Sequence, residues 1–159
     1  MEVFVPILMG SRSDLKHAQA AATALSSLGI ASEIRVGSAH KTPARLLALL
    51  EQYEADPRPK VYITIAGRSN ALSGMVDAQV SAPVIACPPL SESFGGADIY
   101  SSLRMPSGVA PAVILDPEGA ALFAAKILAL ADPTIRQRIT VLQKQNAERL
   151  IADDAELNP

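Results

Sequence analysis

The chain has 159 residues, of which 49% are hydrophobic and 19% are charged, and its formal net charge is −2. This size and composition predict a single folded domain and exclude a disordered segment. The weak negative charge, the lack of a basic block and the scarcity of aromatic residues argue against nucleic acid as a partner. One cysteine, Cys87, excludes an internal disulfide. Since neither a membrane span of ~18 apolar residues nor a signal peptide is present, we expect a cytoplasmic protein with no membrane partner.

The predicted elements alternate between strands and helices. In chain order they are a strand at 3–9, a helix opened by residues 10–14 and ending near Leu28, a strand at 30–36, a helix at 43–54, a strand at 61–66, a helix at 71–80, a strand at 83–86, a short helix at 98–103, a strand at 112–115, a helix at 117–131 and a helix at 133–155. Only Pro6 conflicts with its strand, because proline cannot donate to a ladder. Such alternation implies βαβ units. We predict one three-layer α/β/α domain over residues 1–159, with a central parallel sheet of flavodoxin-like type.

The last predicted helix, 133–155, has no strand after it. Ile135, Ile139, Leu142 and Leu150 fall near helical spacing, with polar residues between them. Such a helix either closes its own domain or packs on another subunit. Because the five-strand core already has helices for both of its faces, we expect an oligomerisation helix.

Several loops that follow the predicted strands carry the residue types that chemistry needs. In a parallel sheet the carboxyl ends of the strands meet at one edge, which is where open α/β sheets bind their ligands. The loops at this edge are residues 10–14, 38–43, 67–74 and 87–89, with 104–108 nearby. We therefore expect the functional site there.

The loop at 38–43 places a serine, an imidazole and an ammonium within four residues, as Ser38, His40 and Lys41. Capping of the next helix by Ser38 or Thr42, with Pro43 in its first turn, accounts for part of this pattern. It gives no reason for His40 or Lys41. Histidine is the only side chain whose unperturbed pKa lies near neutrality, so His40 is either a proton-transfer group or a surface residue.

The loop at 10–14 suits a phosphorylated ribose. Gly10 allows close approach, and the hydroxyls of Ser11 and Ser13 and the N–H groups at a helix start favour an anion. Asp14 would repel a phosphate but can accept hydrogen bonds from a neighbouring ribose diol. The structural alternative is that Ser11 or Ser13 caps the helix while Asp14 complements its dipole.

The loop at 67–74 is rich in glycine and small polar residues, and two interpretations of it remain open. It either brings backbone N–H groups close to a ligand or simply carries an N-cap at Ser69 or Asn70. Other chemistry finds less support. We interpret Cys87 as structural and His17 as a surface residue, and the few histidines and the cysteine are not grouped as zinc ligands would be. A phosphoacceptor receiver would need clustered acids at strand ends, but the third strand runs into residues 66–68 (Ala-Gly-Arg). A flavin carrier would need aromatic residues there, and the loops at this edge supply few.

These loops resemble those of the phosphoribosylaminoimidazole carboxylase family, which acts in purine biosynthesis. The resemblance covers about residues 3–131 and rests on four ordered motifs: residues 10–14 (Gly-Ser-Arg-Ser-Asp), 38–43 (Ser-Ala-His-Lys-Thr-Pro), 66–74 (Ala-Gly-Arg-Ser-Asn-Ala-Leu-Ser-Gly) and 101–108 (Ser-Ser-Leu-Arg-Met-Pro-Ser-Gly). It implies a homo-oligomer, an octamer being favoured over a tetramer, with a C-terminal helix that reaches neighbouring subunits. It also implies carboxylation with no metal, biotin, ATP or other cofactor.

The resemblance also implies roles for individual residues. His40 would be the proton shuttle. The substrate would be held by Gly10, Ser11, Ser13, Asp14, Ser38, Lys41, Ser69, Asn70 and Ala71. Lys41 stands where the mutase class of the family typically has arginine, and residues 68–70 (Arg-Ser-Asn) replace a loop that carries a second histidine in that class.

These two departures resemble the class that adds CO2 directly to aminoimidazole ribonucleotide, so we expect those two molecules as substrates. The alternatives are a mutase that rearranges N5-carboxyaminoimidazole ribonucleotide and a nucleotide-binding module without activity.

Overall fold

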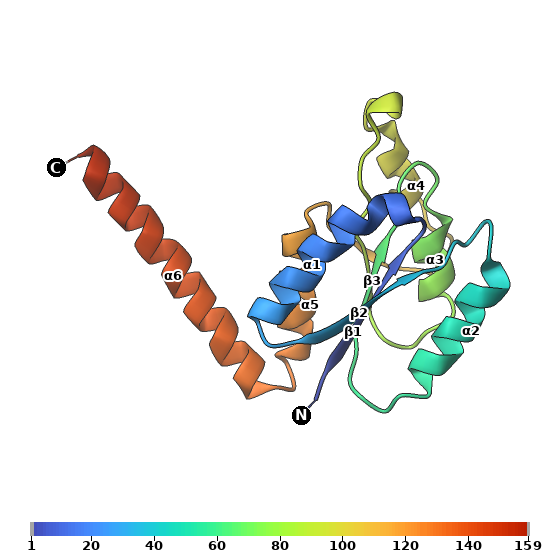
Figure 1. Cartoon of the computed structure of the whole chain (residues 1–159), viewed down its shortest axis with the longest axis horizontal. Coiled ribbons are helices and arrows are strands. Elements are labelled where there is room, and N and C mark those ends of the chain that lie inside the picture. The colour runs from blue at the N-terminus through green and yellow to red at the C-terminus, as the bar shows by residue number, and fades with distance from the viewer. Residues whose placement is uncertain (1, 159) are drawn as a thin grey trace.

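The computed structural model describes residues 2–158, and its centre is a five-stranded parallel sheet (Figure 1). The strand order is β2-β1-β3-β4-β5, with consecutive neighbours in the sheet paired in parallel. The strands are β1 (Phe4–Met9), β2 (Ala31–Val36), β3 (Tyr62–Ile65), β4 (Val84–Ala86) and β5 (Ala112–Val113). This order reverses direction at β1, so the predicted flavodoxin-like fold is confirmed, and the crevice beside β1 and β3 is the expected place for a ligand.

Helices cover both faces of the sheet. They are α1 (Leu15–Ser27), α2 (Pro43–Glu54), α3 (Ala71–Asp77), α4 (Tyr100–Leu103), α5 (Pro117–Leu128) and α6 (Pro133–Leu157). Single 3₁₀ turns are η1 (Arg12–Asp14), η2 (Glu92–Phe94) and η3 (Ala97–Ile99). Helices α1 and α5 lie on one face and α2 and α3 on the other, which gives the three predicted layers.

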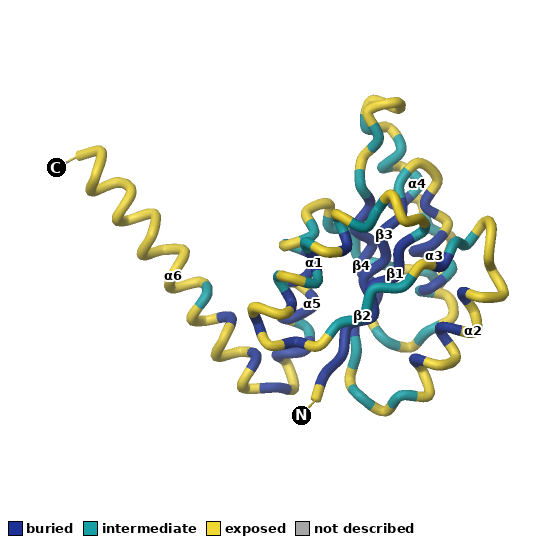
Figure 2. Tube along the Cα trace, in the orientation of Figure 1, coloured by how far each residue is buried: buried dark blue, intermediate teal, exposed yellow. Residues whose placement is uncertain are grey.

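Every residue of β1 is buried, as expected for a central strand covered on both sides (Figure 2). Val5, Ile7 and Met9 pack in the core under α1 and α5, whereas Phe4 and Leu8 pack in the core under α2 and α3. The period of two thus assigns alternate side chains to opposite layers.

Pro6 is tolerated because the ladder between β1 and β3 is interrupted beside it. Phe4 donates its N–H to Pro59 and Gly10 donates to Ile65, and residues two apart point their N–H groups to the same neighbour. In the same register the nitrogen of Pro6, which carries no proton, lies where an N–H would donate to the carbonyl of Val61. The regular pairing of β1 with β3 begins only after it, at Ile7 and Ile63.

Several predicted elements are shorter in the structure; helix α5, for example, ends at Leu128 instead of residue 131. Helix α3 ends at Asp77 instead of residue 80, since Ser81 donates its N–H to the Glu54 carboxylate and Pro83 disfavours helical backbone before it. Strand β5 ends at Val113 instead of residue 115, because it is an edge strand whose only neighbour, β4, ends at Ala86.

Helix α6 extends away from the rest of the molecule (Figure 1). Its start is fixed by Asp132, which accepts hydrogen bonds from the N–H groups of Thr134 and Ile135. Only Ile135 and Ile139 are buried, whereas Ile151 keeps 70% of its surface exposed (Figure 2). Within residues 2–158 no helix combines the length and the apolar character needed to cross a membrane.

Candidate functional site

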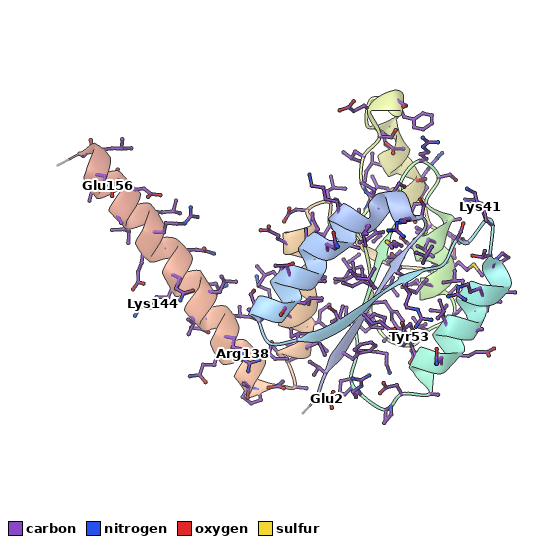
Figure 3. The ribbon with its side chains drawn as sticks, viewed as in Figure 1. Glu2, Lys41, Tyr53, Arg138, Lys144 and Glu156 are labelled. Carbon is purple, nitrogen blue, oxygen red and sulfur yellow. The ribbon has the colours of Figure 1, made fainter. Side chains whose placement is uncertain are left out.

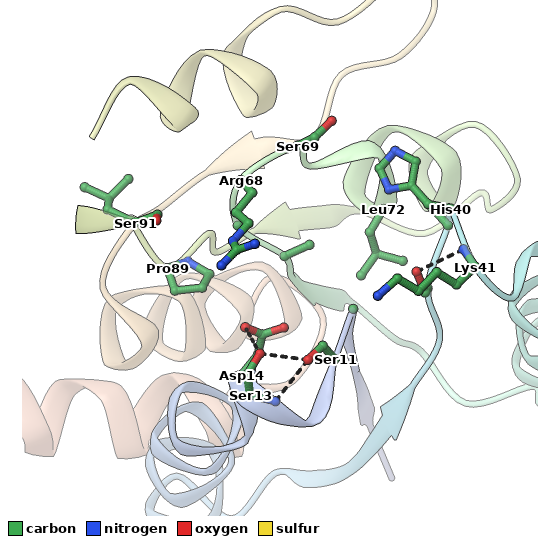
Figure 4. A pocket seen from close by; sticks show the side chains of 16 residues that line it. Ser11, Ser13, Asp14, His40, Lys41, Arg68, Ser69, Leu72, Pro89 and Ser91 are labelled. Atoms are coloured by element: carbon green, nitrogen blue, oxygen red, sulfur yellow. Dashed lines mark hydrogen bonds between the residues drawn. The ribbon is translucent and has the colours of Figure 1, made fainter. Parts of the chain in front are cut away.

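A pocket of about 580 Å³ opens at the carboxyl ends of the strands (Figure 4). It is lined by Gly10, Ser11, Ser13, Asp14, Ser38, Ala39, His40, Lys41, Ala66, Gly67, Arg68, Ser69, Leu72, Pro89, Leu90 and Ser91. All of the predicted site residues except Asn70 and Ala71 are in this set. Loops that follow β1, β2, β3 and β4 therefore converge as the sequence predicts.

The loop after β1 is ordered by its own hydroxyls. The Oγ atom of Ser11 accepts the N–H of Ser13 at 3.1 Å and lies 2.7 Å from the Oγ of Ser13, so Ser11 is the cap. Burial raises the pKa of the Asp14 carboxyl above its ordinary value, and hydrogen bonds from Ser11 and Ser13 and the charge of His17 offset this only partly. This carboxylate is held beside the pocket at an electrostatic cost.

The turn at 38–42 is closed by hydrogen bonds within itself. Ser38 accepts the N–H of Lys41 on its Oγ at 3.2 Å, and Thr42 accepts the N–H of Ser38 on its Oγ1 at 3.0 Å. Neither side chain caps α2, contrary to the prediction for Ser38 or Thr42, because both are used by the turn. The rigid turn leaves the exposed His40 and Lys41 side chains, which make no hydrogen bond to any described residue, at the pocket rim (Figure 4).

The loop after β3 has a constrained backbone. A Cβ atom at Gly67 would lie 2.6 Å from the carbonyl oxygen of Pro89, so only glycine fits there. Arg68 has φ 59°, the left-handed conformation that non-glycine residues seldom adopt. The N–H of Arg68 donates to Asp98 and that of Asn70 donates to Ser101.

Asn70 and Ala71, which we predicted to hold substrate, do not line this pocket. The Asn70 side chain is only 3% exposed; it caps α3 by accepting the N–H of Ser73 and donates to the hydroxyls of Ser73 and Ser102. Ala71 uses its N–H on the carbonyl of Ser69. The N-cap interpretation thus holds for Asn70, whereas Ser69 lines the pocket.

Sequence reasoning placed the loops that contain Arg68 and Pro89 at this edge but gave neither residue a role, and it missed Leu90 and Ser91. The segment after β4 contains no regular strand or long helix, so no periodic pattern marked it. The sequence places Arg68 in a glycine-containing loop but does not indicate its left-handed backbone conformation. In Figure 4 the Arg68 guanidinium and the Lys41 ammonium approach the pocket from different sides, and Asp14 lies below them beside Ser11 and Ser13.

Cys87 and His17 form a contact outside this pocket. The Cys87 thiol is buried and lies 3.4 Å from Nε2 of His17. Burial, with a contribution from Asp116, raises the pKa of Cys87 to about 12, so it stays a thiol, as the structural interpretation expects. His17 is half-buried against this thiol and is not the surface residue we predicted. Across residues 2–158 no three His, Cys, Asp or Glu side chains are grouped as metal ligands.

Comparison with known proteins identifies the family. The AIR carboxylase family model matches residues 4–149. The phosphoribosylaminoimidazole carboxylase of Treponema denticola is 55% identical over 157 residues, which are 99% of each chain. A crystal structure of Treponema denticola PurE superposes with a TM-score of 0.96 at 54% identity, covering 98% of this chain and 99% of that one.

A fused relative matches over a shorter length. The bifunctional phosphoribosylaminoimidazole carboxylase/phosphoribosylaminoimidazole succinocarboxamide synthetase of Mus musculus is 46% identical over 126 residues, 79% of this chain and 30% of the mouse protein. Family model, full-length relative and superposed structure agree. The chain belongs to the AIR carboxylase family, enzymes of purine biosynthesis.

Proposed function

We propose that this enzyme carboxylates aminoimidazole ribonucleotide at C4 with CO2, and that His40 moves the proton. The observation that carries the proposal is a single pocket that gathers His40 and Lys41 with the hydroxyls of Ser11 and Ser13 and the carboxylate of Asp14. A proton-transfer group thereby lies beside groups suited to a phosphorylated ribose.

The nucleotide is held by the loop after β1. The Ser11 and Ser13 hydroxyls donate to the phosphate, for which they exchange their mutual hydrogen bond of 2.7 Å. Asp14 accepts from the ribose hydroxyls, which are donors that suit its partly buried carboxylate. Lys41 and Arg68 supply positive charge to a pocket that receives an anionic substrate.

The chemistry requires one proton transfer. The electron-rich C4 forms a bond to the carbon of CO2, which leaves C4 tetrahedral and still bearing its hydrogen. His40 takes this proton, and the electron pair of the C–H bond returns to the ring to restore aromaticity. Imidazole suits the step because its unperturbed pKa lies near the working pH.

The new carboxylate needs donors that do not move during the reaction. Lys41 and Ser69 line the pocket, and the N–H groups of Gly67 and Ser69 are those of the 67–70 loop that no described residue accepts. The N–H groups of Arg68 and Asn70 are already used by Asp98 and Ser101 and are withdrawn from this role. Fixed donors aimed at developing charge are an effective form of transition-state stabilisation.

The choice of CO2 over the carbamate rests on Lys41 and on the loop at 68–70. An ammonium is a point charge, whereas a guanidinium is a planar fork suited to bidentate anions, so lysine here is not equivalent to arginine. The similarity to a fused animal carboxylase and the name of the Treponema relative support the same class.

The test is to supply the two substrates side by side. We expect the purified enzyme to make carboxyaminoimidazole ribonucleotide from aminoimidazole ribonucleotide, at a rate that rises with dissolved CO2. We expect it to convert N5-carboxyaminoimidazole ribonucleotide poorly when the assay is complete before that compound decomposes. Fast conversion of the carbamate without any benefit from CO2 would assign the enzyme to the mutase class.

We also propose that the enzyme is a homo-oligomer assembled through α6. Beyond Ile139 this helix keeps Leu150 60% and Ile151 70% exposed, which is apolar surface that a second subunit can cover. Truncation after Gln143 retains the buried Ile135 and Ile139, so we expect the shortened chain to fold but to assemble into smaller particles. Light scattering that gives the same number of subunits per particle as the intact protein would exclude α6 beyond residue 143 from the interface.

A further inference from the structure

A carboxylate outside the pocket accepts hydrogen bonds from two of the segments that line it, and we call this pair of hydrogen bonds the tie. The Oδ2 atom of Asp98 accepts the N–H of Arg68 at 3.1 Å and the N–H of Ser91 at 3.1 Å. Arg68 and Ser91 both line the pocket, one in the loop after β3 and the other in the segment after β4. Asp98 itself belongs to η3 and is not among the lining residues. One oxygen therefore fixes the spacing between two walls that are far apart in sequence.

The tie acts on the most strained backbone of the site. Arg68 is the one non-glycine residue between 2 and 158 with a positive φ, at 59°. Such a conformation persists only where surrounding contacts over-determine it. Besides the bond to Asp98, Ser101 accepts the N–H of Asn70 at 2.9 Å and donates to the carbonyl of Asp98 at 2.7 Å. The segment from 98 to 101 thus holds both ends of residues 68–70.

The other oxygen of Asp98 indicates that this residue is not optimised for stability. Oδ1 is buried and has no hydrogen-bond partner among the described residues. A buried acceptor without a donor costs free energy, and such atoms are rare in folded proteins. An apolar side chain would avoid this cost, so the contribution of this carboxylate to the structure lies in the two hydrogen bonds that Oδ2 accepts.

We propose that Asp98 is a positioning residue for carboxylation, which holds the loop at 67–70 so that the N–H groups of Gly67 and Ser69 and the side chain of Arg68 face the pocket. This inference rests on the proposed function of the pocket. Asp98 acts through the geometry of the loop, so it affects the step in which negative charge develops on the new carboxylate. The nucleotide contacts of Ser11, Ser13 and Asp14 lie on a different loop and do not depend on it.

The kinetic test compares two substitutions of Asp98 with a matched control. Asp98→Ala removes the tie, whereas Asp98→Asn keeps an oxygen that can accept both N–H groups. We expect kcat to fall about 30-fold in Asp98→Ala with KM for aminoimidazole ribonucleotide changed less than threefold, and Asp98→Asn to stay within about threefold of the unaltered enzyme. Asp77→Ala is the control, because Asp77 accepts the N–H of Ala110 at 2.8 Å away from the pocket. It should leave the kinetics unchanged.

Hydrogen–deuterium exchange provides a readout that does not depend on turnover. Peptides covering 66–72 and 89–94 should exchange faster in Asp98→Ala than in Asp98→Asn, while Asp77→Ala should affect only the peptide around Ala110. Unchanged exchange in Asp98→Ala overturns the proposal. So do an unchanged kcat in Asp98→Ala and an equal loss in Asp98→Asn, which would implicate the charge instead of the tie. If the unaltered enzyme carboxylates nothing, the proposed function fails, and the exchange pattern alone supports or overturns the tie.

Discussion

Polar side chains at the two ends of the sheet differ in whether they are paired with other residues of the chain. At the carboxyl ends of the strands, His40, Lys41 and Arg68 surround a hollow without any side-chain hydrogen bond or ion pair to the described residues. At the amino ends of β1 and β3, polar side chains of similar types are paired with one another. Figure 3 shows Lys41 and Glu2 at these opposite ends of the molecule.

The amino end is a closed network. Arg58 pairs with Asp56 at 2.6 Å and with Glu2 at 3.2 Å, and its guanidinium lies 4.3 Å from the ring centre of Phe4. This pairing lowers the pKa of Asp56 to about 2, chiefly through the hydrogen bond from Arg58. The charges of Arg58, Asp56 and Glu2 are thus paired with one another within the fold.

The difference separates residues that stabilise the fold from residues that we propose to serve the reaction. Satisfied charges need no ligand, and their loss is felt in stability. Unsatisfied polar groups that converge on a cavity are suited to bind or react, and their loss is felt in turnover. Substitutions at the two ends should therefore change different observables.

The largest effect is expected at His40. His40→Asn removes the proposed proton-transfer group and should lower kcat by about 10³-fold, within the range usual for general acid–base catalysis. Binding of aminoimidazole ribonucleotide, measured by calorimetry, should stay within about tenfold, because the proposed phosphate and ribose contacts lie on another loop. Retention of more than a few per cent of the activity would show that His40 is not the base.

Substitution of Asp14 should change ligand binding and protein stability in opposite directions. Asp14→Asn should weaken binding of aminoimidazole ribonucleotide about tenfold or more, because the charged acceptor proposed for the ribose hydroxyls becomes a neutral amide. A calorimetric titration measures this directly. Unchanged affinity would remove Asp14 from the ribose site.

The same substitution should stabilise the folded protein at neutral pH. The folded-state pKa of Asp14 is raised, mainly by burial, so the native protein is fully stable with respect to this group only below its unfolded pKa. Stability is then lost as the pH rises through the folded pKa. Asp14→Asn should therefore melt at a higher temperature than the unaltered protein at pH 7, and the gain should vanish below about pH 3.8. A lower melting temperature at pH 7 would mean that the carboxylate stabilises the fold.

The sequence predicts one half of this contrast better than the other. Order and type of the main elements follow from local periodicity, and the motifs after β1 and β2 are contiguous, so Ser11, Ser13, His40 and Lys41 were identified from short stretches. The side of the pocket formed by the loop after β3 depends on contacts between residues distant in the sequence, such as Arg68 with Asp98 and Asn70 with Ser102. The sequence allowed an N-cap at Asn70 but could not show that its amide also donates to Ser102, which is distant in the sequence.

The smallest effect is expected at the amino end, where Tyr62 begins β3. Its ring is fully buried, and its hydroxyl donates to Glu54 at 2.8 Å. Tyr62→Phe should lower the free energy of unfolding by about 1 kcal/mol, the usual net contribution of one such hydrogen bond, and should leave kcat and KM unchanged. Tyr53→Phe is the matched variant, because the Tyr53 hydroxyl donates to Glu33 at the same distance. Urea titrations at pH 7 and the carboxylation assay measure the two quantities.

The dependence of stability on pH in alkaline solution sharpens this last prediction. Burial, and then the hydrogen bond to Glu54, raises the pKa of Tyr62 above its ordinary value. Stability from this phenol is therefore complete below the unfolded pKa of 10.0 and is lost as the pH rises through the folded value, because only the unfolded chain ionises readily. Tyr62→Phe should decline less steeply in stability above pH 10 than the unaltered protein, so the two unfolding curves should converge there. A loss of turnover at neutral pH with unchanged stability would break the distinction between the two ends of the sheet.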